Sequence, residues 1–249
     1  MVVSATRSEA ARSRRHYVSP HGAHSDVDTY MGLNKALLGS AQVDPAAADP
    51  AVRSPNAYLV SQAPGAQLHA HFHSSDQFQV IVGGSGRIGT HEVRAVMVHF
   101  AAAHSPYGPV VAGPDGLQYL TLRRAWDAGA QFMPEQAQQL RGMQGRRHLT
   151  YTSEPVAAQS RPLPGADAYA VTTLFQDGLT GAWVVDLRPG AAWRRDAKAD
   201  HFVYLLDGSA QVHGANMEPQ GCLFAGSEED SPFLAGPSGA RVLIAQFGG

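Results

Sequence analysis

The stretch Pro64–Gly86 has the sequence PGAQLHAHFHSSDQFQVIVGGSG, in which His69, His71 and His73 alternate with other residues. Successive side chains on a β-strand point to opposite faces, so a strand here places all three imidazoles on one side. Gln77–Val82 has the composition of a second strand, and two glycines end it. Because imidazole is the commonest protein ligand of first-row transition metals, these two strands predict a metal site.

The pattern of this stretch resembles the first motif of the cupin superfamily, written G-x5-H-x-H-x3/4-E-x6-G. Four residues fall on positions of the motif: Gly65, His71, His73 and Gly84. Gln77 stands where the family usually has a metal-binding glutamate. The resemblance implies a small β-barrel that binds a metal ion in its interior.

The second motif of the family, P-x-G-x2-H-x3-N, resembles residues 101–113, AAAHSPYGPVVAG, less closely. When Tyr107 is placed at the position of the usual third histidine, His104 lies three residues earlier, where the family has a glycine. The resemblance therefore implies a changed or relocated fourth ligand.

The ion implied by the resemblance is a divalent transition metal: iron, nickel, manganese or zinc. His71, His73 and Gln77 are its expected ligands, and either His104 or Tyr107 completes the set. A neutral glutamine offsets less of the positive charge of a divalent ion than glutamate does. The metal is then a stronger Lewis acid, and the protein retains it less tightly. The alternative is that these histidines form hydrogen bonds inside the barrel and hold no ion.

Two further residues are candidates for contact with a substrate. Tyr107 is a candidate general acid, and His69 lies on the histidine face but nearer the barrel rim. Gln79 alternates with Gln77 and is expected to add a polar group to the barrel lining. Arg123 has the chemistry to bind a carboxylate by paired hydrogen bonds, although arginine is more often a surface residue.

A second copy of the pattern follows 124 residues later, since 200 − 76 = 124. Asp76–Gly86, DQFQVIVGGSG, has a counterpart in Asp200–Ala210, DHFVYLLDGSA. Repeats of turn and core positions at one offset indicate two copies of one fold. In this alignment Arg195 stands opposite His71 and His201 stands opposite the glutamine, so the second copy lacks the ligand set.

The predicted fold is all-β: two tandem cupin-type barrels (double-stranded β-helix or jelly-roll) joined by a short helical linker. Its expected parts are an irregular N-terminal arm (1–55), the first barrel with the site (56–126), a connector (127–165) and the second barrel (166–249). Helices are expected within the arm at Asp26–Leu38 and within the connector at Pro134–Met143.

The composition of the 249 residues narrows the class of partner. A net charge of −2 gives no general basic field for nucleic acid or an anionic membrane. A single cysteine, Cys222, excludes an intrachain disulfide and fits a reducing compartment, so we expect a cytoplasmic protein. No apolar run reaches the roughly 18 residues of a membrane span.

These features predict a metal-dependent enzyme that acts on a small polar or aromatic molecule in the first barrel. The reaction is expected to be an isomerase or lyase step that uses Lewis acidity, or a dioxygenase step if the ion is iron. The competing hypothesis is a non-catalytic small-molecule-binding bicupin whose metal site has decayed. An N-terminal arm and exposed sheet edges make a homodimer the expected assembly.

Overall fold

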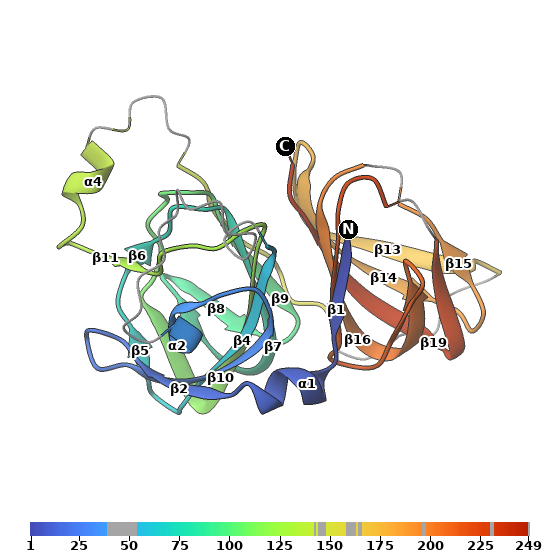
Figure 1. Ribbon diagram of the computed structural model, residues 1–249, viewed down its shortest axis with the longest axis horizontal. Coiled ribbons are helices and arrows are strands. Elements are labelled where there is room, and N and C mark those ends of the chain that lie inside the picture. Colours follow the sequence, from blue (N-terminus) through green and yellow to red (C-terminus); the bar gives the residue numbers. More distant parts are fainter. Residues whose placement is uncertain are drawn as a thin grey trace. The chain divides into compact units, whose positions relative to one another are not determined.

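The computed structural model describes residues 1–38, 54–141, 143, 148–157, 163, 166–195, 198–229 and 232–248. These residues form two compact units, each built mainly of β-strands (Figure 1). We call Arg12–Pro155 the first barrel, and Met1–Ala11 together with Val156–Gly249 the second barrel. The all-β tandem architecture predicted from the sequence is confirmed.

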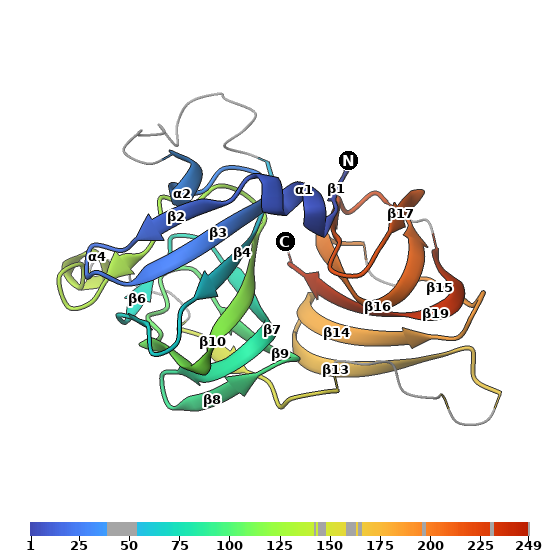
Figure 2. The same cartoon turned by 90° about the horizontal axis from the view of Figure 1, so that it is seen from below.

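In the described part of the first barrel, the main sheet has the strand order β12-β9-β7-β10-β4-β3-β2, with β5 beside β10 and β8 beside β7. Figure 2 shows how β3, β4, β10 and β7 follow one another around it. A short sheet pairs β11 with β6. The strands are β2 (Arg15–Val18), β3 (His24–Met31), β4 (Asn56–Gln62), β5 (Gln67–Leu68), β6 (His71–Phe72), β7 (Gln77–Ile88), β8 (His91–Arg94), β9 (Met97–Ala101), β10 (Val110–Arg123), β11 (Gln131–Phe132) and β12 (Thr150–Thr152).

The described part of the second barrel repeats this plan with the order β1-β18-β16-β19-β14-β13, with β15 beside β19 and β17 beside β16. Its strands are β1 (Val2–Ala5), β13 (Tyr169–Asp177), β14 (Thr180–Leu187), β15 (Ala192–Trp193), β16 (His201–Val212), β17 (Ala215–Met217), β18 (Cys222–Ala225) and β19 (Phe233–Gln246). The described helices are short: α1 (Arg7–Arg12), α2 (Lys35–Leu38) and α4 (Gln138–Arg141).

The internal repeat corresponds to two matching strand pairs. β7 and β16 each have 12 residues. Phe78 of β7 pairs with Leu122 of β10, and Phe202 of β16 pairs with Ala245 of β19. Both phenylalanines are almost fully buried, which removes apolar surface from water at the same place in each unit. The sequence alignment of the two copies therefore reflects equivalent positions in space.

Residues 1–38 do not form the partly irregular arm that the sequence suggested, and residues 39–53 of that arm lie outside the described residues. β1 pairs with β18 in the second barrel, whereas β2 and β3 extend the sheet of the first barrel beyond β4. The helix expected at Asp26–Leu38 is wrong over its first half, because His24–Met31 is a strand. Cross-strand pairing with β4 and burial of Val27, Tyr30 and Met31 outweigh the helical spacing of the apolar residues.

The strand expected at Gln77–Val82 is present but longer, since β7 continues through Gly83-Gly84 to Ile88. Within Pro134–Met143 only Gln138–Arg141 is helical, and residue 142 lies outside the described residues.

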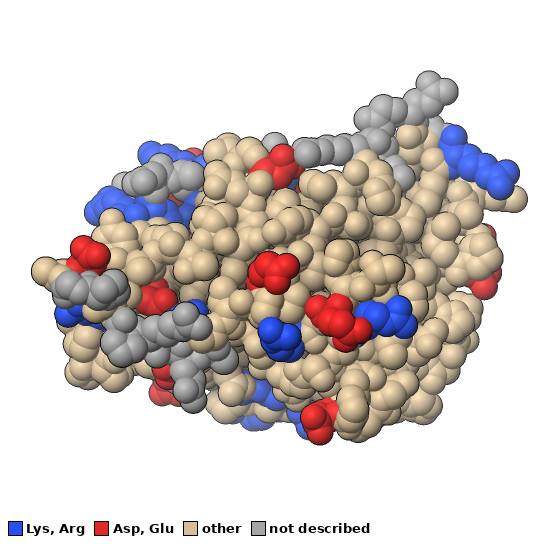
Figure 3. Space-filling view, turned by 180° about the vertical axis from the view of Figure 1, so that it is seen from behind, with Lys and Arg blue, Asp and Glu red and all other residues tan. Residues whose placement is uncertain are grey.

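Among the described residues, no helix is both long and apolar enough to span a membrane. On the face shown in Figure 3, acidic and basic side chains are interspersed and most of the visible surface is uncharged.

Candidate functional site

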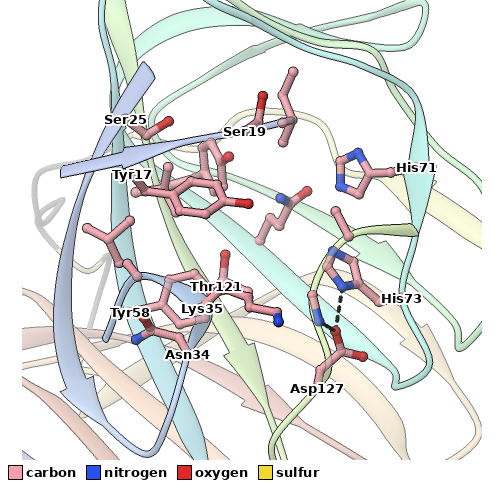
Figure 4. Close-up of a pocket in the computed structure, with 18 of the residues that line it drawn as sticks. Tyr17, Ser19, Ser25, Asn34, Lys35, Tyr58, His71, His73, Thr121 and Asp127 are labelled. Carbon is pink, nitrogen blue, oxygen red and sulfur yellow. Dashed lines mark hydrogen bonds and ion pairs between the residues drawn. The ribbon is translucent and has the colours of Figure 1, made fainter. Parts of the chain in front are cut away.

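The first barrel contains a cavity of about 750 Å³, counting its mouth to solvent. One wall consists of residues from β2, β3 and α2, including Tyr17, Ser25 and Lys35, and the opposite wall includes His71 and His73. Figure 4 shows these side chains pointing toward a common space from the two sides. The N-terminal strands therefore complete the barrel around the predicted histidine site.

His71 and Tyr107 lie directly opposite each other on neighbouring segments. Their backbones exchange two hydrogen bonds of 3.0 Å, one from each N–H to the other residue's carbonyl oxygen. The two ring centroids are 4.5 Å apart, and both side chains are buried. This pairing places the phenol of Tyr107 at the side-chain position that the alignment gave to the third histidine.

A directed chain of hydrogen bonds links the site residues. His71 Nδ1 lies 2.7 Å from the carbonyl oxygen of His69, which only accepts, so Nδ1 carries the proton and Nε2 is left with a lone pair. The Tyr107 hydroxyl, 2.8 Å away, donates to that Nε2. Gln77 Nε2 donates to the Tyr107 oxygen over 2.5 Å. The phenol thus has a partner for its proton and for its oxygen.

Arg123, at the end of β10, continues this chain. Its Nη2 and Nε donate to Gln77 Oε1 over 2.7 and 3.1 Å, and its Nη1 donates to the Tyr58 hydroxyl over 3.0 Å. The side chain is only 3% exposed. Burial opposes the charge, but interactions with Tyr58 and Asp127 raise the pKa of Arg123 overall, so the guanidinium is charged inside the barrel.

His73 is held between Arg123 and Asp127. Its Nδ1 lies 2.7 Å from an Asp127 oxygen and therefore donates, which leaves the lone pair on Nε2. Arg123 Nη2 lies 3.1 Å from Nδ1 and 3.2 Å from Nε2. Asp127 also accepts hydrogen bonds from Ser74, Ser75 and the Gly129 N–H. Burial raises the pKa of Asp127, but Arg123 and these donors outweigh it and hold that pKa well below its usual range. The carboxylate is therefore ionised and fully used within the protein.

The imidazoles and the phenol are neutral at physiological pH. Burial lowers the pKa of His71 to about 3 and also lowers the pKa of His73. Burial raises the pKa of the Tyr107 phenol. The charged groups that line the cavity are then Lys35 and Arg123 against Asp127, which leaves one excess positive charge.

The structure brings together His71, His73, Gln77 and Tyr107, but not His104. The His104 ring lies 6.1 Å from that of Phe72, which points to the opposite side of its strand from His71, and His104 does not line the cavity. Only its backbone N–H approaches the site, donating to the carbonyl oxygen of His73 over 2.6 Å.

His69 lies between β5 and β6 and not within the single histidine strand that the sequence suggested. Its ring stacks on His21 with centroids 4.3 Å apart, and it does not line the cavity. The carbonyl oxygen of His69, rather than its imidazole, takes part in the hydrogen-bond chain.

Sequence reasoning missed Tyr17, Lys35 and Asp127 and gave little weight to Arg123. Tyr17 and Lys35 lie in the segment expected to be an irregular arm, and Asp127 begins the expected connector. None of them belongs to a motif with fixed spacing. The one available signal was the strand alternation of 117–123, LQYLTLR, which places Tyr119, Thr121 and Arg123 on the same face.

The residues of this site, as arranged, do not fit a divalent metal ion. His71 Nε2 accepts a hydrogen bond from the Tyr107 hydroxyl, and Gln77 Oε1 accepts from the Arg123 guanidinium. Arg123 Nη2 also lies 3.1 and 3.2 Å from the two ring nitrogens of His73. A dication about 4 Å from a guanidinium is repelled by roughly 8 kcal/mol at an effective dielectric constant of about 20. Among the described residues, no group of three or more His, Cys, Asp or Glu side chains is placed to hold a metal.

Searches with this sequence give no matching family model and no matching curated protein. Solved structures resemble it in fold. The oxalate decarboxylase of Lactobacillus farciminis, in complex with formate, is 13% identical with a TM-score of 0.60, covering 98% of this chain and 85% of that chain. Bacterial pirin YhhW from Escherichia coli with nickel(II) is 12% identical with a TM-score of 0.60, covering 99% of each chain.

HEPD from Streptomyces albus, with 2-hydroxyethylphosphonate and Fe(II) bound, is 13% identical with a TM-score of 0.59 and covers 100% of this chain and 76% of that chain. At these identities the similarity shows the fold and not the activity. All three are cupin-fold proteins. The chain therefore has the cupin fold, in two tandem all-β barrels, as the histidine motif and the internal repeat predicted.

Proposed function

We propose that the first barrel binds a small organic anion, a carboxylate that also carries a hydroxyl group. The observation that carries this proposal is the charge of the cavity. Lys35 and Arg123 face one carboxylate, Asp127, whose oxygens are already satisfied by His73, two serines and a backbone N–H. The excess positive charge in a partly enclosed cavity favours an anionic ligand.

Lys35 is the group best placed to meet the carboxylate. Among the described residues no hydrogen bond or ion pair of its ammonium is present, and it lines the cavity from α2. Arg123, by contrast, uses most of its donors on Tyr58, Gln77 and His73. We therefore assign direct contact with the anion to Lys35, while Arg123 contributes its charge to the potential in the cavity.

The polar lining supports a hydroxyl group on the ligand. Gln79 lines the cavity, and its buried Oε1 has no hydrogen-bond partner among the described residues. A buried amide oxygen without a donor costs roughly 1–3 kcal/mol, which a ligand hydroxyl or a bound water recovers. The rings of Tyr17, Tyr58, Tyr119 and Phe132 surround the same space and suit an aromatic or compact aliphatic body.

The ligands of the structural relatives agree with this class. Two of the solved relatives hold small anions, formate and 2-hydroxyethylphosphonate. In this chain, neutral Tyr107 and His71 retain their protons at neutral pH, which favours orienting a bound molecule over transferring a proton.

Calorimetric titration tests the proposal with three matched probes: mandelate, its amide mandelamide, and phenylacetate, which lacks the hydroxyl. We expect mandelate to bind at least tenfold more tightly than mandelamide, because the amide has no charge for Lys35 to meet. Phenylacetate is expected to bind more weakly than mandelate because Gln79 Oε1 stays unpaired. Equal affinities, or no saturable binding of any probe at 10 mM (a concentration chosen on the order of weak pocket affinities), contradict the proposal.

The first testable variant is Lys35→Met, which removes the charge and keeps the length of the side chain. We expect it to weaken mandelate binding about tenfold and to leave mandelamide binding unchanged. The chain's other lysine, Lys198, is exposed in the second barrel and provides the control variant Lys198→Met. If both variants bind mandelate like the wild type, Lys35 does not contact the anion.

The metal-dependent isomerase, lyase or dioxygenase suggested by the sequence motif stays a prediction. Two structural relatives hold nickel(II) and Fe(II), which is the reason to test it. The test is the metal content of the purified wild type and of the His71→Ala/His73→Ala variant. Near-stoichiometric metal in the wild type, lost in the variant, supports that function, and its identity chooses between oxygen chemistry and Lewis-acid chemistry.

A further inference from the structure

We infer that the Arg123 guanidinium takes the place of the metal ion in the first barrel, as a cation built into the chain. It organises the positions that the cupin motif uses for metal ligands, so the cavity is kept in shape without any bound ion. The network joins Arg123 to the motif positions and does not depend on which small molecule the cavity binds.

The first support is the use of the ligand atoms. Once the protons on His71 Nδ1 and His73 Nδ1 are assigned to their oxygen partners, each imidazole has one lone pair, on Nε2. The Tyr107 hydroxyl donates to His71 Nε2 over 2.8 Å, and Arg123 Nη2 donates to Gln77 Oε1 over 2.7 Å. The same Nη2 lies 3.1 and 3.2 Å from the two ring nitrogens of His73, so the guanidinium lies against this ring. Two of the electron pairs that a metal requires are thus committed to protein donors, and the guanidinium charge lies beside the third.

The second support is the set of residue changes that accompany Arg123. A glutamate at position 77 would bring a second negative charge and could accept a metal, whereas Gln77 is neutral and accepts from Arg123 while donating to Tyr107. A histidine at position 107 would offer one more lone pair, whereas the Tyr107 hydroxyl supplies a proton to His71. Each departure from the motif replaces a metal-binding atom with a group that fits the guanidinium-centred network. A planar guanidinium with five N–H donors is well suited to join several acceptors.

The third support comes from the second barrel, where an arginine again bonds a glutamine. Arg195 stands opposite His71 in the repeat, and Gln246, which pairs with His201, stands opposite Arg123. Arg195 Nη2 donates a hydrogen bond to Gln246 Oε1. Each barrel therefore contains an arginine–glutamine hydrogen bond with one partner at a position of the ligand set, Gln77 in the first barrel and Arg195 in the second.

Metal titration of three forms of the full chain, without an affinity tag, tests the inference. The wild type is compared with Gln77→Glu/Tyr107→His, which restores both motif ligands but keeps Arg123, and with the triple variant that adds Arg123→Met. Ni²⁺ and Mn²⁺ are the probes, read by calorimetry and by the shift in melting temperature. Arg87→Met, at an exposed arginine of β7, is the control for loss of an arginine elsewhere.

We expect no stoichiometric binding to the wild type, the double variant or the control, and one bound ion in the triple variant, at least a hundredfold tighter. Restoring the ligands alone is insufficient because Arg123 then pairs with Glu at position 77. The inference is overturned if the wild type binds one equivalent of either ion and loses it in His71→Ala/His73→Ala, or if the double variant binds as tightly as the triple. A folded triple variant that binds no metal also contradicts it. If circular dichroism shows the triple variant unfolded, the wild-type titration still decides.

Discussion

The Arg123 side chain is 3% exposed and is bonded to Tyr58, Gln77 and His73, so its loss leaves several buried groups without partners. Hydrogen bonds to a charged group contribute about 1.5–3 kcal/mol, and an unpaired buried acceptor costs a similar amount. Residues that are individually ordinary, a glutamine and a tyrosine in a strand, become interdependent through this one guanidinium.

We therefore expect Arg123→Met to lower the free energy of unfolding of the first barrel by about 3 kcal/mol. Methionine fills much of the same volume, so lost hydrogen bonds rather than a cavity account for the effect. Urea denaturation followed by tryptophan fluorescence measures it, with Arg87→Met expected to change stability by less than about 0.5 kcal/mol. Equal small losses in both variants would show that the Arg123 network contributes little.

At the scale of elements, β7 and β10 of the first barrel and β16 and β19 of the second carry the repeat. Gly84 and Gly208 occupy the same place in the two pairs, with φ of +66° and +78°. A Cβ built on either would lie 2.2 Å from the carbonyl oxygen of Gly116 or Gly239. The partner strand is too close for any side chain, so Gly84 of the motif and its counterpart Gly208 serve the strand pairing.

Gly84→Ala is expected to destabilise the first barrel by about 3 kcal/mol or more, since it combines a positive φ with a backbone clash. Gly65→Ala is the matched control: its φ is +71°, but no atom lies within 4 Å of the added Cβ. We expect only the conformational cost there, about 1 kcal/mol. Thermal unfolding of the two variants separates the cost of the positive φ from the cost of the backbone clash. Equal melting temperatures would show that the clash does not destabilise the barrel.

At the scale of the whole molecule, three buried histidines link stability to pH. Burial lowers the pKa of His71, His99 and His201 to about 3, below the ordinary value of 6.5. Between these values the unfolded chain binds a proton that the folded chain does not bind. The contribution of these histidines to the free energy of unfolding is therefore complete above about pH 6.5 and decreases as the pH is lowered toward 3.

We expect scanning calorimetry between pH 4 and pH 8 (a range chosen around a reference pKa of about 6.5) to show melting temperatures that decrease on the acid side. Each histidine contributes at most about 1.4 kcal/mol per pH unit. His201→Gln should reduce this slope for the second barrel, whereas the exposed His91→Gln serves as control. A melting temperature that is constant from pH 8 to pH 4 would show that the buried histidines do not titrate with unfolding.

The homodimer and the cytoplasmic location stay predictions.

The sequence alone determined the fold class, the repeat and the shared cavity of His71 and His73, but not the place of His69, whose ring does not line the cavity. The alternation in Pro64–Gly86 and the glycines at strand ends are local patterns, and the offset of 124 residues is read by comparing the two copies. The pairing of His71 with Tyr107 rather than His104 was one of two alternatives that the residues left open. Local pattern could not choose between them, because the loop conformation sets which side chain turns inward.

Only the tertiary structure decided what fills the site. The sequence separates Arg123 from His73 by 50 residues and Asp127 from His73 by 54, and no motif fixes such distances. Lys35 and Tyr17 reach the cavity only because β2 and β3 pair beyond β4 and close the wall. Burial then sets the charge of each group: His71 stays neutral, and the charged Arg123 guanidinium lies among the positions that the cupin motif uses for metal ligands. Charge and burial at a site depend on long-range packing, which local sequence pattern does not contain.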